Sequence, residues 1–115
     1  MKIGIDIVSI DRMKRIYKKF GFKFLHKVFT EAEIAEIEAI NNHSRKIEKI
    51  AGKFAVKEAV VKASNVPVEF AKIEVLTDKT GAPTVKVENN IRYEISIAHE
   101  RLYAVAVAIL VENKE

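Results

Sequence analysis

The spacing of apolar residues changes at Ser64-Asn65-Val66-Pro67, and this change limits the fold classes open to the chain. The chain begins with an alternating segment at 2–8, and from there to the break apolar residues recur at helical spacing. After the break they alternate every second position, as in strands, in four segments: 73–77, 84–87, 94–98 and 102–111. We therefore expect an α+β fold in which helices of the N-terminal half pack on a mainly antiparallel sheet. The 115 residues fit a single domain spanning 1–115.

Capping signals set the expected helix boundaries. Ser9 can cap a first helix that ends at Gly21. Thr30-Glu31-Ala32-Glu33 is a capping box and begins a second helix, which Asn41-Asn42-His43 ends. The third helix, at about 44–63, is the longest of the three. The final strand is apolar on both faces, so we expect it to be central and covered by the helices.

The net charge of +4 is concentrated at the N-terminus. Residues 1–27 hold eight Lys and Arg against two Asp, a net of +6, so the rest of the chain carries −2. A concentrated basic segment indicates a polyanionic partner, which could be nucleic acid, a membrane surface or an acidic protein. The alternative is a solvated helix face whose charge serves only solubility.

Several classes of protein are excluded or made less plausible by what the sequence lacks. It has no cysteine, which removes disulfides, zinc–thiolate sites and cysteine nucleophiles. It has no Gly-x-Ser-x-Gly elbow, phosphate-binding loop or dinucleotide fingerprint. The longest apolar run, Leu102–Val111, is about half the length of a membrane helix. Because Asp6 interrupts the place of a signal-peptide core, we expect a cytoplasmic protein that does not bind membranes.

The third helix carries three groups of side chains at helical spacing. Four lysines share one face: Lys46, Lys49, Lys53 and Lys57. Beside them lies an apolar stripe, and on its far edge Glu58 and Lys62 follow Ala51 and Ala55. Glu58 and Lys62 could be an ordinary helix-stabilising ion pair. Alternatively, the small alanines let a ligand approach, so that Glu58 holds a hard cation and Lys62 meets a phosphate.

Asp6 is the candidate second carboxylate for such a cation. Mg²⁺ commonly takes one or two protein carboxylates and completes its shell with water and phosphate oxygens. Asp6 lies between Ile5 and Ile7 in a strand that we expect to be central, where an unpaired carboxylate is unfavourable. The alternative is that Asp6 faces water on an edge strand.

Four segments together resemble the small bacterial holo-[acyl-carrier-protein] synthases, a type of 4′-phosphopantetheinyl transferase. They are spread over nearly the full chain, and the third is the most specific. The segments are Gly4-Ile5-Asp6-Ile7-Val8 with Arg12, Phe29-Thr30-Glu31-Ala32-Glu33, Ala51–Ala59 running on to Lys62-Ala63, and Ile95-Ser96-Ile97-Ala98-His99 leading into Tyr103–Ala106.

The resemblance implies the 4′-phosphopantetheinyl transferase fold and transfer of 4′-phosphopantetheine from coenzyme A to a serine of apo acyl carrier protein. It implies that Asp6 and Glu58 hold Mg²⁺. The position of Lys62 suits stabilisation or protonation of the leaving group, and our first choice for the base that takes the serine proton is Glu58, directly or through a metal-bound water. The residues expected to contact coenzyme A are Lys53, Lys57, Lys62, Ser96 and His99. For His99, the alternative is an ordinary hairpin-loop histidine.

The resemblance also implies a use for the basic segment and an oligomeric state. Similar enzymes bind the carrier protein through the basic first helix, and the candidates here are Arg12, Lys19, Lys23 and Phe24. They are homotrimers whose active site lies at the subunit interface. The main alternative is a small basic nucleic-acid-binding protein, and another is a catalytically silent trimeric scaffold. Because a nucleic-acid role leaves Asp6 and Glu58 unexplained and the segment lacks an aromatic platform, we expect no nucleic-acid partner.

Overall fold

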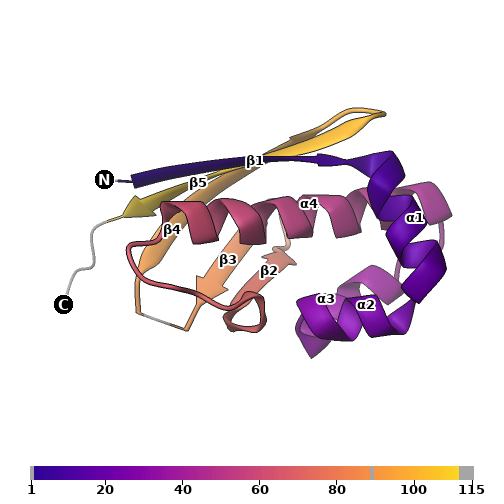
Figure 1. The fold of residues 1–115 in the computed structure, drawn as a ribbon, viewed down its shortest axis with the longest axis horizontal. Helices are drawn as coiled ribbons and strands as arrows, with labels where there is room; N and C mark the ends of the chain where they lie inside the picture. The colour runs from indigo at the N-terminus through magenta and orange to yellow at the C-terminus, as the bar shows by residue number, and fades with distance from the viewer. Residues whose placement is uncertain (1, 89, 112–115) are drawn as a thin grey trace.

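The computed structural model describes residues 2–88 and 90–111, and it confirms the α+β class. Helices and strands are largely separated along the chain: one strand is followed by four α-helices, a 3-10 helix η1 and four more strands (Figure 1). In chain order these are β1 (Lys2–Ser9), α1 (Ile10–Phe20), α2 (Phe22–Val28), α3 (Glu31–Glu38), α4 (His43–Ala63), η1 (Phe70–Lys72), β2 (Ile73–Thr77), β3 (Pro83–Val87), β4 (Arg92–His99) and β5 (Tyr103–Val111). No helix within these described ranges is both long and apolar enough to cross a membrane.

Two antiparallel sheets carry the strands. The larger has the order β1-β5-β4, and the smaller pairs β2 with β3. The central place of β5 is confirmed, whereas the expectation that Lys2–Val8 is central is wrong, because β1 pairs with β5 alone and forms an edge. Helix α4 runs along one face of the larger sheet, and α1, α2 and α3 gather beyond one end of it (Figure 1).

The contact between α4 and β1 depends on small residues. A Cβ atom added to Gly4 would lie 1.9 Å from the carbonyl oxygen of Ala59, so only glycine fits there. Ala51, Ala55 and Ala59 are completely buried. The sequence interpretation that these alanines leave room for a ligand is therefore wrong, because the sheet occupies that space. The close approach instead brings β1 side chains next to those of α4.

The opposite face of the larger sheet is apolar and exposed. Ile3, Ile5 and Ile7 each keep at least 60% of their surface exposed. On β5, alternate residues are buried under α4 and half-buried on the open face. The prediction that helices cover the final strand therefore holds for one face and fails for the other.

The predicted caps at Ser9 and Thr30 are confirmed, but one helix was not foreseen. The expectation that Asn41-Asn42-His43 ends the second helix is wrong, because α3 ends at Glu38 and Asn42 caps α4, its Oδ1 accepting from the Arg45 amide at 3.0 Å. The Ser9 hydroxyl accepts from the Arg12 amide at 3.1 Å, and α1 ends at Gly21, whose φ of +53° suits glycine. Helix α2 begins directly after this glycine. The capping box at Thr30 and Glu33 is present, with both reciprocal hydrogen bonds formed.

Candidate active site

The structure brings Asp6, Glu58 and Lys62 together where β1 lies against α4. Asp6 points towards the helix and is mostly buried, although β1 is an edge strand. The Lys62 amine donates to Asp6 Oδ1 at 3.1 Å and to the Ile5 carbonyl at 3.0 Å. This placement is consistent with the prediction that Asp6 lies beside Glu58 and Lys62. It is inconsistent with the alternative that Asp6 faces water.

The charges in this group are unbalanced, and Glu58 shows the effect. Burial raises the pKa of the Glu58 carboxyl, and the nearby Asp6 carboxylate raises it further. The Lys62 amine acts in the opposite direction. Two carboxylates facing one ammonium group form a site with an excess of negative charge. Such a site favours a cation.

A pocket of about 280 Å³ opens beside the two carboxylates. Asp6 and Glu58 line it together with Arg12 from the first turn of α1, and Phe24 and Phe54 contribute to its apolar wall. Arg12 and Phe24, which the sequence assigned to partner binding, therefore lie at the mouth of the carboxylate site rather than on a remote surface.

The donor set fits Mg²⁺. Carboxylate oxygens are the ligands that this cation prefers, and it needs few of them when phosphate oxygens are available. Within the described part of the chain, no group of three or more His, Asp or Glu side chains could hold a metal. Two carboxylates, Asp6 and Glu58, suit a cation that takes two protein ligands and completes its shell from a substrate.

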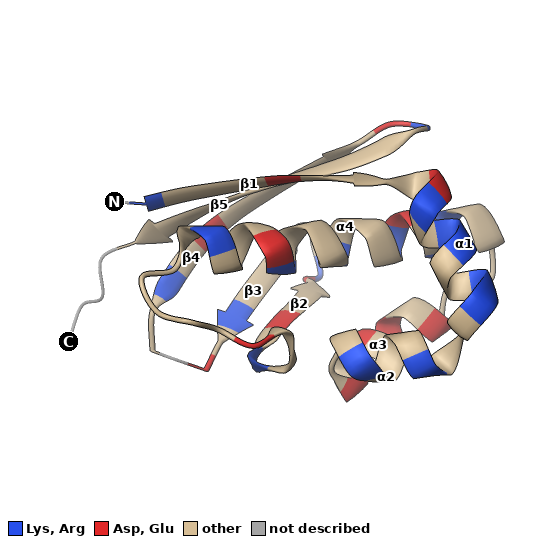
Figure 2. Ribbon diagram, in the orientation of Figure 1, with Lys and Arg blue, Asp and Glu red and all other residues tan. Residues whose placement is uncertain are grey.

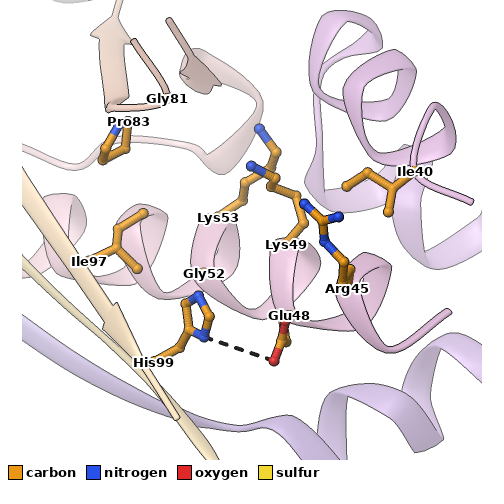
Figure 3. A pocket seen from close by; sticks show the side chains of 10 residues that line it. All are labelled: Ile40, Arg45, Glu48, Lys49, Gly52, Lys53, Gly81, Pro83, Ile97 and His99. Atoms are coloured by element: carbon orange, nitrogen blue, oxygen red, sulfur yellow. Dashed lines mark ion pairs between the residues drawn. The ribbon is translucent and has the colours of Figure 1, made fainter. Parts of the chain in front are cut away.

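A second pocket, of about 380 Å³, lies along the first half of α4 (Figure 3). Its basic side chains come from two elements: Arg45, Lys49 and Lys53 from α4, and His99 from the end of β4. The His99 ring is half-exposed, and its Nδ1 lies 3.9 Å from a Glu48 carboxylate oxygen. Sequence reasoning did not name Arg45 as a site residue. Its spacing of four from Lys49 and eight from Lys53 was the available signal.

The two buried lysines of α4 differ from the expectation that they meet coenzyme A. Lys57 is completely buried, and its amine lies 2.8 Å from Glu33. Lys53 is 2% exposed and lies 2.8 Å from Glu36, although it lines the second pocket. Burial lowers the pKa of both amines, and their carboxylate partners oppose this shift. The structure therefore gives no support to Lys57 as a phosphate ligand, because its amine cannot be reached.

Ser96 is not brought into either pocket of the same chain. It pairs with Val107 in the sheet, whereas His99 pairs with Ala104. Because successive side chains alternate across a strand, Ser96 lies on the open face and His99 on the face that α4 covers. A single subunit therefore does not unite Ser96 and His99 in one binding site.

The basic segment forms a surface on α1 and α2, where Lys and Arg dominate (Figure 2). Lys19 is exposed near the end of α1, and Lys23 is exposed in α2 rather than in the first helix. Phe20 and Phe22, between them in sequence, are exposed large apolar residues. This surface adjoins the pocket that Arg12 and Phe24 line.

Comparisons with known proteins agree with this geometry. A family model described as 4′-phosphopantetheinyl transferase superfamily matches residues 2–108. The holo-[acyl-carrier-protein] synthase of Thermodesulfovibrio yellowstonii is 43% identical over 111 residues, covering 94% of this chain and 96% of that protein. The enzyme of the same name from Chloroherpeton thalassium is 38% identical and covers 99% of this chain and 100% of its own.

Solved structures match equally well. The crystal structure of a holo-(acyl-carrier-protein) synthase from Bacillus anthracis in complex with CoA (3′,5′-ADP) aligns with a TM-score of 0.85 at 33% identity, covering 95% of this chain and 94% of that one. The Helicobacter pylori synthase in complex with coenzyme A aligns with a TM-score of 0.79 at 33% identity, covering 95% and 99%.

The fold and the paired carboxylates thus place the chain in the 4′-phosphopantetheinyl transferase superfamily, and within it the chain belongs to the holo-[acyl-carrier-protein] synthase family. As a member it is an enzyme, a phosphopantetheinyl transferase. Membership removes both non-catalytic alternatives, the nucleic-acid-binding protein and the silent scaffold.

Proposed function

We propose that this enzyme transfers 4′-phosphopantetheine from coenzyme A to a serine hydroxyl of apo acyl carrier protein and releases adenosine 3′,5′-bisphosphate. The observation that carries the proposal is the group formed by Asp6, Glu58 and Lys62, with two carboxylates held beside one exposed amine. The names of the relatives support the carrier protein as acceptor, and the coenzyme A complexes support the donor.

In this reaction, Asp6 and Glu58 would hold Mg²⁺ against the coenzyme A pyrophosphate. The bound cation would polarise the phosphate under attack and offset charge on the departing one. Glu58, directly or through a water bound to the cation, is our candidate for the group that accepts the serine proton. As the serine oxygen bonds to phosphorus, the anhydride P–O bond breaks and its electrons leave with adenosine 3′,5′-bisphosphate. Lys62 can stabilise or protonate that leaving oxygen.

The second pocket would hold the phosphorylated adenosine end of coenzyme A. Arg45 and Lys49 place two cationic groups around one cavity, and cationic side chains suit phosphate. The His99 ring lines the same cavity and can add a hydrogen bond. Ser96 would contribute only from a neighbouring subunit. Lys53 and Lys57 are left out of this assignment because both amines are buried and paired with Glu36 and Glu33.

A transfer assay tests the reaction directly. Incubation with apo acyl carrier protein, coenzyme A and Mg²⁺ should increase the mass of the carrier by one phosphopantetheine. Chelation of the metal or a Glu58→Ala substitution should abolish the mass increase. An unmodified carrier with the unaltered enzyme, or transfer that survives both treatments, would show that the proposal is wrong.

We propose that the carrier docks on α1 and α2, where Lys19 and Lys23 are exposed. Because Arg12 and Phe24 line the carboxylate pocket, their substitution would mix docking with chemistry. Lys19→Glu with Lys23→Glu is therefore the cleaner test, and Lys86→Glu on β3 is a matched charge reversal elsewhere. The double variant should raise KM for the carrier and leave KM for coenzyme A unchanged. Equal changes in both constants would contradict the docking assignment.

We further propose a homotrimer in which the two pockets of neighbouring subunits form one active site. The exposed Ile3, Ile5 and Ile7 support an interface on the open sheet face, because contiguous apolar surface of this kind marks association. If the sites are shared, mixing and refolding equal amounts of inactive Glu58→Ala and His99→Glu subunits should restore activity. Random assembly joins an intact Glu58 to an intact His99 at about a quarter of the interfaces. Light scattering should give the mass of three chains. A mass of one chain would contradict the trimer.

A further inference from the structure

The outer edge of β2, away from β3, is covered by side chains instead of another strand. Two backbone amides on this edge donate to glutamates of α3: Val75 to Glu33 Oε2 at 2.8 Å, and Thr77 to Glu36 Oε2 at 3.0 Å. The glutamates are three residues apart, so they share one face of α3. Each carboxylate thus takes the place of a carbonyl that a neighbouring strand would have supplied.

Two lysines of α4 complete the same edge from the other side. The Lys57 amine donates to the Ile73 carbonyl, and the Lys53 amine donates to the Val75 carbonyl. Lys57 also binds Glu33 Oε1 at 2.8 Å, and Lys53 binds Glu36 Oε1 at 2.8 Å. Two parallel Glu–Lys pairs therefore join α3, β2 and α4.

The Glu33–Lys57 pair leaves little freedom to move. An ammonium group has three protons to donate, and Lys57 directs them to Glu33, to Ile73 and to the Phe70 carbonyl at 2.9 Å. The Phe29 ring lies 5.5 Å from the same nitrogen. Both side chains of the pair are completely buried. These hydrogen bonds are directional, so they fix the position of the Lys57 amine. Apolar packing is not directional and would fix it less firmly.

These anchored lysines lie across α4 from the carboxylate site. At 100° per residue, the mean direction of Glu58 and Lys62 is about 140° from that of Lys53 and Lys57. A rotation of the helix by about 20° would move an outer side-chain atom by roughly 2 Å. A displacement of about 1 Å can lower a rate a hundredfold. The position of Glu58 relative to Asp6 therefore depends on how firmly α4 is held on its far side.

We propose that the Glu33–Lys57 pair, assisted by Glu36–Lys53 one turn earlier, is a positioning device that fixes the rotation of α4 and so holds Glu58 opposite Asp6. Glu33 and Lys57 are positioning residues, because neither touches the reacting groups. This inference rests on the proposed metal-dependent transfer, but it concerns residues that the transfer does not use directly.

The test replaces the pair without leaving a lone buried charge. In the double variant Glu33→Gln with Lys57→Met, the amide oxygen can still accept from Val75. Lys46→Met is the control, since Lys46 lies on the same helix and pairs with Glu38 at 3.8 Å. Circular dichroism would establish folding. Mg²⁺ alone would then be titrated in, and the backbone amide signals of Asp6 and Glu58 followed by NMR.

We expect the double variant to bind Mg²⁺ at least about tenfold more weakly, as happens when groups behind metal ligands are changed. In the transfer assay kcat should fall by a similar factor, while the affinity for adenosine 3′,5′-bisphosphate stays unchanged. The control should match the unaltered protein in all three. A folded double variant with unchanged Mg²⁺ affinity, or one that loses no more than the control, would overturn the proposal.

If the Glu33→Gln, Lys57→Met variant does not fold, the variant Glu36→Gln with Lys53→Met tests the positioning role instead. Lys53 lines the second pocket, so this variant is assessed by the Mg²⁺ titration alone, which does not involve that pocket. A weaker affinity supports the positioning role, and an unchanged affinity overturns it. Failure of the proposed function has a different signature. In that case the unaltered protein would transfer nothing, while the Mg²⁺ titrations would still distinguish the variants.

Discussion

Helix α4 uses the same residue types in opposite ways on its two sides. On the inner side, Lys53 and Lys57 each meet one glutamate of α3, so every carboxylate there has its own cationic partner. Lys49 lies 3.9 Å from the same Glu36 carboxylate. On the site side, Lys62 faces two carboxylates, those of Asp6 and Glu58, and negative charge is in excess. Both inner lysines are almost inaccessible to solvent, and so is Glu33, although Glu36 is 25% exposed. The Lys62 side chain is 52% exposed.

The difference shows what separates a structural ion pair from a reactive one. Residue type and helical spacing are shared by the two sides, so neither can identify the site. The distinguishing property is whether the charges are balanced within the protein. Two neighbouring carboxylates repel each other, and a bound cation relieves that repulsion. A buried carboxylate that is already paired with an ammonium group has no free charge with which to bind a ligand.

The largest effect should come from removing one partner of a balanced pair. Lys57→Met leaves Glu33 charged and buried, and we expect a loss of about 3–5 kcal/mol in the free energy of unfolding. Lys62→Met removes an exposed amine, so its effect on stability should lie within about 1 kcal/mol, although transfer should fall sharply. Urea denaturation of both variants measures the contrast. Similar losses for the two lysines would mean that the two sides of α4 do not differ as described.

The close approach of β1 to α4 brings Asp6 to the site side and can be broken at one position. Gly4→Ala places a methyl group against the Ala59 carbonyl, and we expect a loss of about 3 kcal/mol or more in stability. Gly52→Ala is the matched control, because its Cβ would meet Ile97 at an ordinary 3.6 Å. Within a helix that change favours stability by up to about 1 kcal/mol. Thermal melts that rank the two variants the other way would contradict the close approach.

Much of the fold could be predicted because its signals are local. Side-chain caps and changes of period depend on residues within a few positions, and they located α1, α3, α4 and the two C-terminal hairpins correctly. Helix α2 was missed because Gly21 ends one helix and begins another without a side-chain cap. The edge position of β1 was missed because strand order depends on pairing across the whole chain.

The residues predicted for the centre of the site lie together in the structure, whereas two predicted for its periphery are buried. Asp6 and Glu58 stood out as carboxylates in apolar surroundings, and the structure brings them to one pocket. Lys53 and Lys57 were expected to contact coenzyme A because they lie in the segment that carries the family resemblance, and their spacing alone does not show that they are buried. Their burial depends on Glu33 and Glu36, and Glu33 was visible in sequence only as a member of a capping box.

The inner side of α4 should respond to acid in a way that shows its balanced charge. Burial acts to raise the pKa of Glu36, but hydrogen bonds from Lys53 and Thr77 outweigh it, so the pKa is lowered. Its stabilising contribution is therefore present above the ordinary glutamate pKa and is lost as pH falls through the lowered value. Glu36→Gln should melt at a lower temperature at pH 7, and the difference should shrink in acid. A constant difference from pH 7 to pH 3 would contradict this assignment.

The site side should give the smallest effect, with the opposite sign. Because the pKa of Glu58 is raised, the folded state disfavours its charge, and the penalty is complete above the raised pKa. Glu58→Gln, in metal-free buffer, should therefore melt slightly higher than the unaltered protein at pH 7 while losing transfer. As pH falls through the raised pKa towards the ordinary 4.5, the unaltered protein takes up the proton and the difference should vanish. Added Mg²⁺ should stabilise the unaltered protein more than the variant, because the cation binds the folded carboxylate pair. A Glu58→Gln variant that melts lower at pH 7 without metal would show that Glu58 is balanced like Glu36, and the distinction between the two sides of α4 would fail.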